Sequence, residues 1–174
     1  MPYATPTSYL QRFGLVETVQ HLADEEQLLT AQLLQDAIAG SWTGSPSLAE
    51  QAAATAALAR LQDALVVQSN YIDGYLRAVV TLPLSDDDAN AGSLRECCLA
   101  LTRWAIADDD DNATERMLKA VEHWRAWLKD VAAGRVHLVT ADGAAPSTEV
   151  RGVRSGQATS RYDWCGFGGG GGMR

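Results

Sequence analysis

The feature that most constrains the fold is a long apolar stripe between residues 48 and 80. Its members recur at intervals of 3, 4, 7, 4 and 3 residues, which places them on one face of an α-helix. They are Leu58, Leu61, Leu65, Ile72, Leu76 and Val79. At 1.5 Å per residue the predicted helix is roughly 50 Å long. Such a stripe is a packing face, and Gly74 is predicted to mark the close approach of a neighbouring element.

A second stripe predicts another long helix, which ends at Ala133. It consists of Met117, Val121, Trp124, Leu128 and Val131, at spacings of 4, 3, 4 and 3 residues. Asn112 followed by Glu115 is predicted to open this helix, and Gly134 stands where a left-handed stop is expected.

Capping residues predict four further helix starts. A Ser, Thr or Asp before an apolar run accepts a hydrogen bond from an otherwise unpaired backbone N–H. The predicted starting pairs are Thr5 with Pro6, Asp24 with Gln27, Ser47 with Glu50, and Ser93 with Glu96, and the corresponding ends fall near Gly14, Gly40, Val80 (before Pro83) and Ala107. The abundance of Ala agrees with helices rather than sheet.

The regular pattern stops near residue 138. The sequence "RVHLV" predicts one short extended piece, and the Gly-, Ala-, Ser- and Thr-rich sequence beyond it has no helical or strand period. The chain is therefore predicted to be an all-α helical bundle with two long helices, a short extended segment and a long extended arm. The bundle occupies residues 1–138 and the Gly-rich arm residues 139–174.

Charge is distributed unevenly along the chain. The whole chain has a formal net charge of −8. From residue 134 onward five Arg oppose three acidic residues, which gives +2 and leaves −10 for the first 133 residues. An acidic body of this kind repels nucleic acid rather than gripping it.

No pattern of catalytic residues is present in the sequence. The three His are far apart, no Ser or Cys stands in a nucleophile motif, and the glycines at 168–172 follow no strand that could open a phosphate loop. Cys97, Cys98 and Cys165 form neither a disulfide framework nor a zinc motif. We therefore expect no enzymatic activity, no cofactor and no metal site.

The sequence also lacks a leader pattern and any apolar run of about 18–20 residues, so a soluble intracellular product without a membrane partner is expected. The Trp side chains divide into two groups. Trp104, Trp124 and Trp127 are predicted to make helix contacts, whereas Trp42 and Trp164 are predicted to contact partners.

Four segments of the chain carry a resemblance to a known family. In order they are "MPYATPTSYLQRFG", "VETVQHLADEE", "SNYIDGYLRAVVTLPL" and "AWLKDVAAGRVHL". They resemble the head–tail connector (adaptor or head-completion) proteins of Mu-like tailed phages. The part from Ile72 to Leu84 is the most specific.

The resemblance implies a helical structural protein of the virion neck, made in the bacterial cytoplasm. Its copies would form a dodecameric ring beneath the portal protein and contact a downstream neck or tail protein. DNA would pass through the ring without specific binding. The alternative is a cytoplasmic helical interaction module that recognises helices in a groove and has a disordered tail.

Two groups of residues are predicted to serve such an assembly. An arm that becomes ordered on the portal or a neighbouring copy would be anchored by its aromatic and basic residues, which are Arg154, Arg161, Tyr162, Trp164 and Phe167. The alternative is a tail held only by its own subunit. A run of acidic residues would face the DNA channel, or would simply favour the start of the following helix; its members are Asp108, Asp109, Asp110 and Asp111.

Overall fold

The computed structural model describes residues 2–23, 26–82, 84, 90–107 and 114–138. These residues form six α-helices and no strand. The helices are α1 (Pro6–Phe13), α2 (Leu15–Leu22), α3 (Ala31–Ala39), α4 (Leu48–Leu76), α5 (Ala91–Ala107) and α6 (Glu115–Ala132). The prediction of an all-helical body is confirmed for the described residues, and the arm at 139–174 lies outside them.

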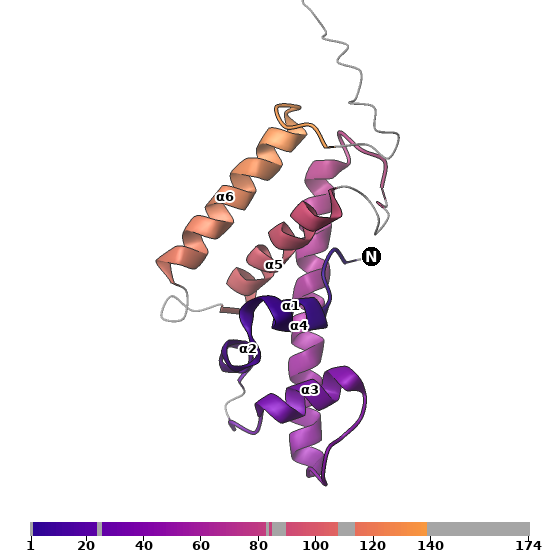
Figure 1. Ribbon diagram of the computed structural model, residues 1–174, viewed down its shortest axis with the longest axis vertical. Coiled ribbons are helices and arrows are strands. Elements are labelled where there is room, and N and C mark those ends of the chain that lie inside the picture. The colour runs from indigo at the N-terminus through magenta and orange to yellow at the C-terminus, as the bar shows by residue number, and fades with distance from the viewer. Residues whose placement is uncertain (1, 24–25, 83, 85–89, 108–113, 139–174) are drawn as a thin grey trace, which may run out of the picture.

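Helix α4 runs along the long axis of the molecule, and the other helices pack around it (Figure 1). Helix α3 lies beside its N-terminal half, and α5 and α6 lie beside its C-terminal half. Helix α1 crosses α4 near the middle. The N-terminal segment is fixed to α4 because the Tyr3 amide donates to Ser69 Oγ at 3.0 Å and the Tyr3 hydroxyl donates to Asp73.

The core lies mainly between α4, α5 and α6. Helix α4 contributes Leu61, Leu65, Ile72 and Leu76, all fully buried as the stripe predicted. Leu58 at the N-terminal end of the predicted stripe is only half-buried, and Val79 at its other end is 39% exposed. The facing residues are Leu94, Cys97, Cys98 and Leu101 of α5 and Val121, Leu128 and Val131 of α6.

The two best-marked helix starts are confirmed. The side chains of Thr5 and Ser47 both accept from the backbone N–H three residues later. In turn, the side chains of Ser8 and Glu50 accept from the backbone N–H of Thr5 and Ser47. Helix α4 nevertheless ends at Leu76 rather than Val80, because the chain turns tightly over residues 77–79 before it reaches Pro83.

Three other predicted helix starts are wrong. Helix α3 is capped by Thr30, not by Asp24, because Gln27 has a positive φ of 51° that interrupts any helix there. Helix α5 begins at Ala91, which leaves Ser93 inside the helix and Glu96 free to pair elsewhere. Helix α6 is capped by Thr114, which accepts from the amide of Met117 at 3.3 Å.

Gly14 and Gly134 lie at helix ends, whereas Gly74 lies inside α4. Helix α2 was not predicted; it begins immediately after α1 because Gly14, with φ 86°, ends one helix and precedes the next. Gly134 has the predicted left-handed conformation, with φ 71°. The expectation for Gly74 is wrong, since a Cβ placed there would meet nothing within 4 Å.

The described part of "RVHLV" is not a strand. Residues 135–138 follow α6 as a turn and a short irregular piece, in which the amide of Arg135 donates to the Asp130 carbonyl at 2.8 Å. Leu138 is buried and returns the chain to the core.

Candidate functional site: a charged groove between α1, α5 and α6

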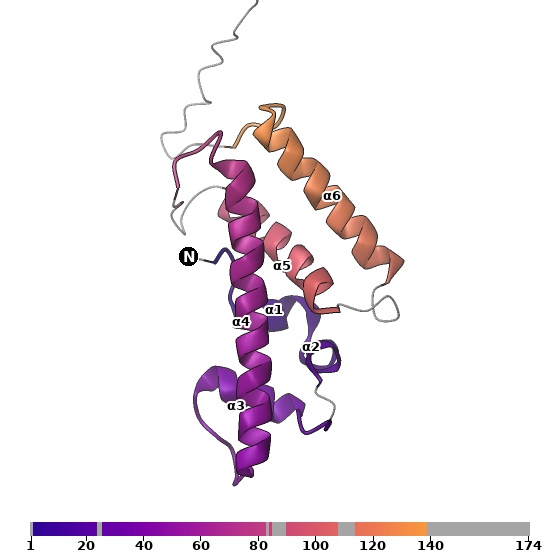
Figure 2. The ribbon, with the colours of Figure 1, turned by 180° about the vertical axis from the view of Figure 1, so that it is seen from behind.

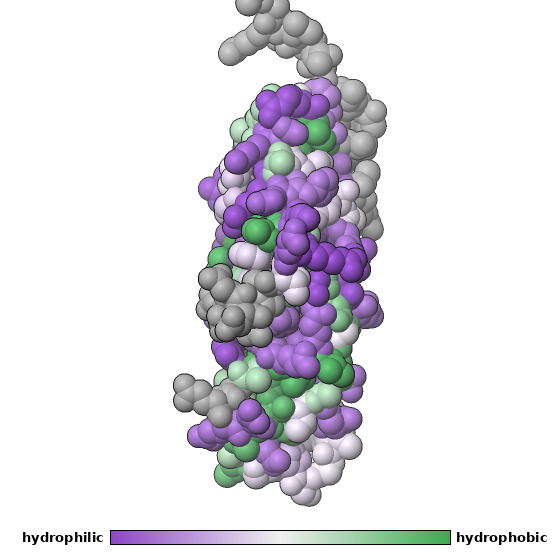
Figure 3. Space-filling view, turned by 90° about the vertical axis from the view of Figure 1, so that its left-hand side faces the viewer, coloured by the Kyte–Doolittle hydropathy of each residue, from purple (hydrophilic) through white to green (hydrophobic). Residues whose placement is uncertain are grey.

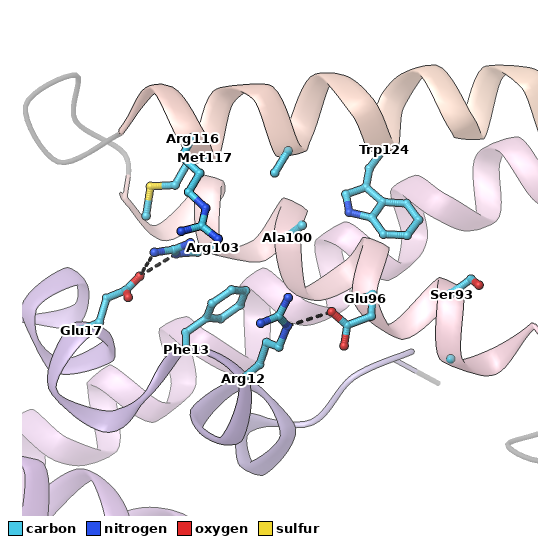
Figure 4. Close-up of a pocket in the computed structure, with 12 residues that line it drawn as sticks. Arg12, Phe13, Glu17, Ser93, Glu96, Ala100, Arg103, Arg116, Met117 and Trp124 are labelled. Carbon is cyan, nitrogen blue, oxygen red and sulfur yellow. Dashed lines mark hydrogen bonds and ion pairs between the residues drawn. The ribbon is translucent and has the colours of Figure 1, made fainter.

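A groove of about 550 Å³ opens between four helices of the body (Figure 4). Helix α5 forms its floor, α6 forms one wall, and α1 with the start of α2 forms the other. Its lining residues are Arg12, Phe13, Glu17, Gly92, Ser93, Glu96, Ala100, Arg103, Arg116, Met117, Ala120 and Trp124. The groove therefore combines charged groups with small and apolar residues.

Helical geometry explains why these α5 residues face the groove. Residues three, four and seven positions apart share a helix face, and Ser93, Glu96, Ala100 and Arg103 have this spacing. Leu94, Cys97, Cys98 and Leu101 occupy the opposite side of α5 and are buried in the core. One face of α5 thus stabilises the fold, and the other forms the groove floor.

Two ion pairs join the walls to the floor. Arg12 Nε of α1 donates to Glu96 Oε2 of α5 at 2.9 Å. Arg103 of α5 bonds Glu17 Oε1 of α2 through Nε at 2.6 Å, and His21 Nε2 lies 3.6 Å from the same oxygen. Because these side chains are partly exposed, each pair contributes little to stability but fixes the positions of the charged groups.

The guanidinium groups of Arg12 and Arg103 both lie over the Phe13 ring. The Cζ atom of Arg103 lies 4.7 Å from the ring centroid, and that of Arg12 lies 5.6 Å from it. A cation over an aromatic face is attracted by the ring quadrupole. Phe13 therefore orients two arginines whose planar forks suit carboxylate groups.

Arg116 is the remaining cation of the groove. It is exposed, it projects from α6 beside Arg103 (Figure 4), and it forms no ion pair with a described residue. Three arginines and two glutamates line the groove, which leaves it net positive in a chain of charge −8. This arrangement suits a partner that presents a carboxylate.

The side of the molecule where α6 and α2 lie has a hydrophilic part and an apolar part (Figure 3). On the side of the molecule where α6 and α2 lie, hydrophilic residues cover most of the upper part (Figure 3). Apolar residues gather lower down on this side, at the level of α2 and α3.

The thiols near the groove are positioned for packing. Cys97 and Cys98 are free and fully buried, as expected of reduced thiols. Burial raises the pKa of Cys97 from its ordinary value of 9.0 to about 12, and burial also raises the pKa of Cys98. Both thiols therefore stay protonated at neutral pH, and a protonated thiol is a poor nucleophile.

Within the described ranges, no group of three His, Cys, Asp or Glu side chains is arranged to hold a metal ion. None of the helices in those ranges is long and apolar enough to cross a membrane.

The predicted site residues have different outcomes. The acidic run at 108–111 and the arm residues from 154 to 167 lie outside the described residues, so both remain predictions. Trp104, Trp124 and Trp127 pack partly buried against the core, which confirms their helix contacts. Trp42 is 36% exposed, which leaves it accessible to a partner.

Sequence reasoning missed the groove itself. The residues in its two ion pairs are separated by 84 and 86 positions, and no local pattern connects residues so far apart. The sequence predicts that Glu96 is the capping partner of Ser93, but Glu96 pairs with Arg12 instead.

In a comparison with protein-family models, residues 3–155 match the family described as "Bacteriophage Mu, Gp36". This chain belongs to the Bacteriophage Mu Gp36 family. The matched region includes every described helix, and it extends past residue 138 into the predicted arm. Membership of the Gp36 family supports a structural or morphogenetic role in a phage. No curated protein matches the chain.

Proposed function

We propose that this Gp36-family chain is a head–tail connector subunit of the virion neck. Its copies form a dodecameric ring beneath the portal protein, join the capsid to the downstream neck or tail protein, and surround a channel for DNA. The protein acts through its surfaces and catalyses no reaction. The charged groove between α1, α5 and α6 supports the proposal, because a protein that acts through its surfaces needs places where partners can bind.

The observation that carries the proposal is that α4, the longest described helix of this phage-family protein, has one side that no described helix covers. Helix α4 spans 29 residues, and none of the other five described helices lies over its outward side (Figure 2). The outward side of α4 carries few charged residues, whereas the exposed face of a surface helix normally carries many. The outward side of α4 includes Val66 and Val67, which are 44% and 58% exposed in the single chain. Burial of this side in an assembly would complete the packing of α4.

The charge of the chain suits a channel protein. The first 133 residues carry −10 and the remaining residues +2, so the body would repel phosphates rather than hold them. In this proposal the acidic run from Asp108 to Asp111 contributes to the channel surface. Its neutralisation to Asn should leave the helical signal intact and alter DNA retention or ejection of assembled particles. Unchanged particles would assign these residues to the helix start alone.

In the proposed assembly the arm fastens the subunit to its partners. Ordering about 20 residues costs roughly 1–2 kcal/mol each, so the arm needs anchors. Tyr162, Trp164 and Phe167 would supply buried area, and Arg154 and Arg161 would pair with acidic partner surfaces.

The direct test mixes the full chain with its cognate portal and images the complexes. A dodecameric ring on the portal is the expected result. A chain ending at Ala158 provides the matched variant: it should keep the helical signal and melting temperature of the full chain but dock much more weakly. Failure of the full chain to bind the portal, with folding intact, would exclude the connector role and favour a separate helical interaction module.

A further inference from the structure

The side of α4 that faces away from the core has an unusual composition. One line of exposed positions, spaced three and four residues apart, runs along the middle of this side over the whole helix. They are Ala49, Ala52, Ala56, Ala59, Asp63, Val67, Asn70 and Gly74, which we call the outer stripe. Asp63 is its only charged residue. Surface helices normally present many charged residues to water, so this stripe resembles a packing surface.

The outer stripe and the charged groove lie on opposite sides of the molecule. Helix α4 buries Leu61 and Leu65 toward α5, and its outer stripe faces the other way. Helix α5 buries Leu94 and Leu101 toward the core, and its groove face is turned away from them. None of the residues that line the groove belongs to α4. Each copy therefore has a convex helix face on one side and a concave groove on the other.

The two surfaces are complementary in charge. The groove has one more cation than it has carboxylates, and Arg116 has no ion-pair partner among the described residues. The outer stripe has one carboxylate, Asp63, at the middle of α4. An Arg and a carboxylate at an interface favour one register and disfavour others.

The two surfaces are also complementary in size. The groove floor runs from Gly92 to Arg103, about 16 Å along the helix axis. Large side chains such as Phe13 and Trp124 already stand in the groove, so an incoming helix must present small residues there. Ala52, Ala56 and Ala59 meet this requirement over the three turns that precede Asp63.

From these observations, and resting on the proposed ring, we infer that the outer stripe of one copy packs into the charged groove of the next. Asp63 of one copy pairs with Arg116 of its neighbour. Helix α4 of one copy runs antiparallel to α6 of its neighbour, so that Ala59 of the first lies beside Ala120 of the second. Because the two surfaces differ, the contact is head-to-tail, and repeated contacts of this kind close into a ring when the rotation allows.

Engineered cysteines in the full chain test this contact. Cys165→Ser removes the thiol beyond the described residues, and Cys97 and Cys98 are buried. With portal present, a chain with both Ala59→Cys and Ala120→Cys should give a ladder of disulfide-linked species larger than a dimer. The control pairs Ala120→Cys with Gln62→Cys, which is exposed on the flank of α4, and should give no ladder. A dimer formed by Ala59→Cys alone would indicate a symmetric α4–α4 contact and overturn the inference.

A charge exchange provides a second, independent test. Asp63→Arg and Arg116→Asp should each weaken ring formation by about tenfold or more, and the double variant should restore most of it. Equal loss in the single and double variants would overturn the pairing.

These outcomes separate the inference from the proposed function. A ring imaged on the portal without the disulfide ladder would leave the connector role standing and reject this contact. A ladder without portal binding would support the contact and reject the connector role.

Discussion

The α4–α5 pair presents two kinds of surface. Between the helices lie fully buried residues such as Leu65, Leu94 and Cys98. On the sides turned away from each other lie the small residues of the outer stripe and the charged residues of the groove, such as Glu96 and Arg103. The same helices thus stabilise the fold on one side and, in the proposed assembly, would contact partners on the other. Substitutions one position apart should therefore have different consequences.

The largest expected difference concerns the neighbours Leu65 and Val66. Leu65 is 1% exposed, so Leu65→Ala should lower the free energy of unfolding of the free chain by about 2–5 kcal/mol. Val66 is 44% exposed, and Val66→Ala should change it by about 0.5 kcal/mol or less. Urea unfolding of the two variants measures both values. Similar losses for both would show that the outward side of α4 is already covered in the free chain.

Substitutions of the neighbours Ala56 and Ala57 by the larger Leu test the same difference between the buried and the outward side of α4. Ala57 is 1% exposed, so Ala57→Leu should overpack the core and cost about 1–3 kcal/mol. Ala56→Leu should leave stability within about 0.5 kcal/mol but hinder ring formation on the portal. Normal ring formation by Ala56→Leu would argue against burial of the outer stripe.

The buried thiols predict a loss of stability at alkaline pH. Burial raises the pKa of Cys97 from 9.0 to about 12, so between these values the unfolded chain releases a proton that the folded chain retains. The free energy of unfolding should then fall as pH rises above about 9, by at most about 1.4 kcal/mol per pH unit from this thiol. Melting scans of the chain and of Cys97→Ala should differ in slope over this range. Identical slopes would contradict the raised pKa of the Cys97 thiol in the folded chain.

The smallest effect is expected in the groove. Arg12 and Glu96 are 56% and 41% exposed, so Glu96→Gln should lower stability by less than about 1 kcal/mol, and salt should reduce this difference. A loss of several kcal/mol would mean that the groove stabilises the fold much as the core does.

Much of the fold was predictable because its signals are local. The stripe on α4 and the capping pair of Ser47 with Glu50 identified the longest helix. The errors fell where two local signals compete. Asp24 and Thr30 both resemble caps, and only the backbone turn at Gln27 decides between them.

The groove was not predictable, because it depends on tertiary packing. The pairing of Arg12 with Glu96 requires α1 to lie close to α5, and no periodicity in either segment encodes that placement. The outer stripe is different in kind. Its small residues are visible in the sequence, but their exposure becomes evident only when the other face of α4 is seen to bury the core.

The central claim is that the outward side of α4 is free in the single chain and covered in the assembly. Thiol labelling of Val67→Cys, with Cys165→Ser, measures this directly in the free chain and in the portal complex. The account predicts rapid labelling of the free chain, where Val67 is 58% exposed, and strong protection in the complex. Equally rapid labelling of a portal-bound chain would contradict it.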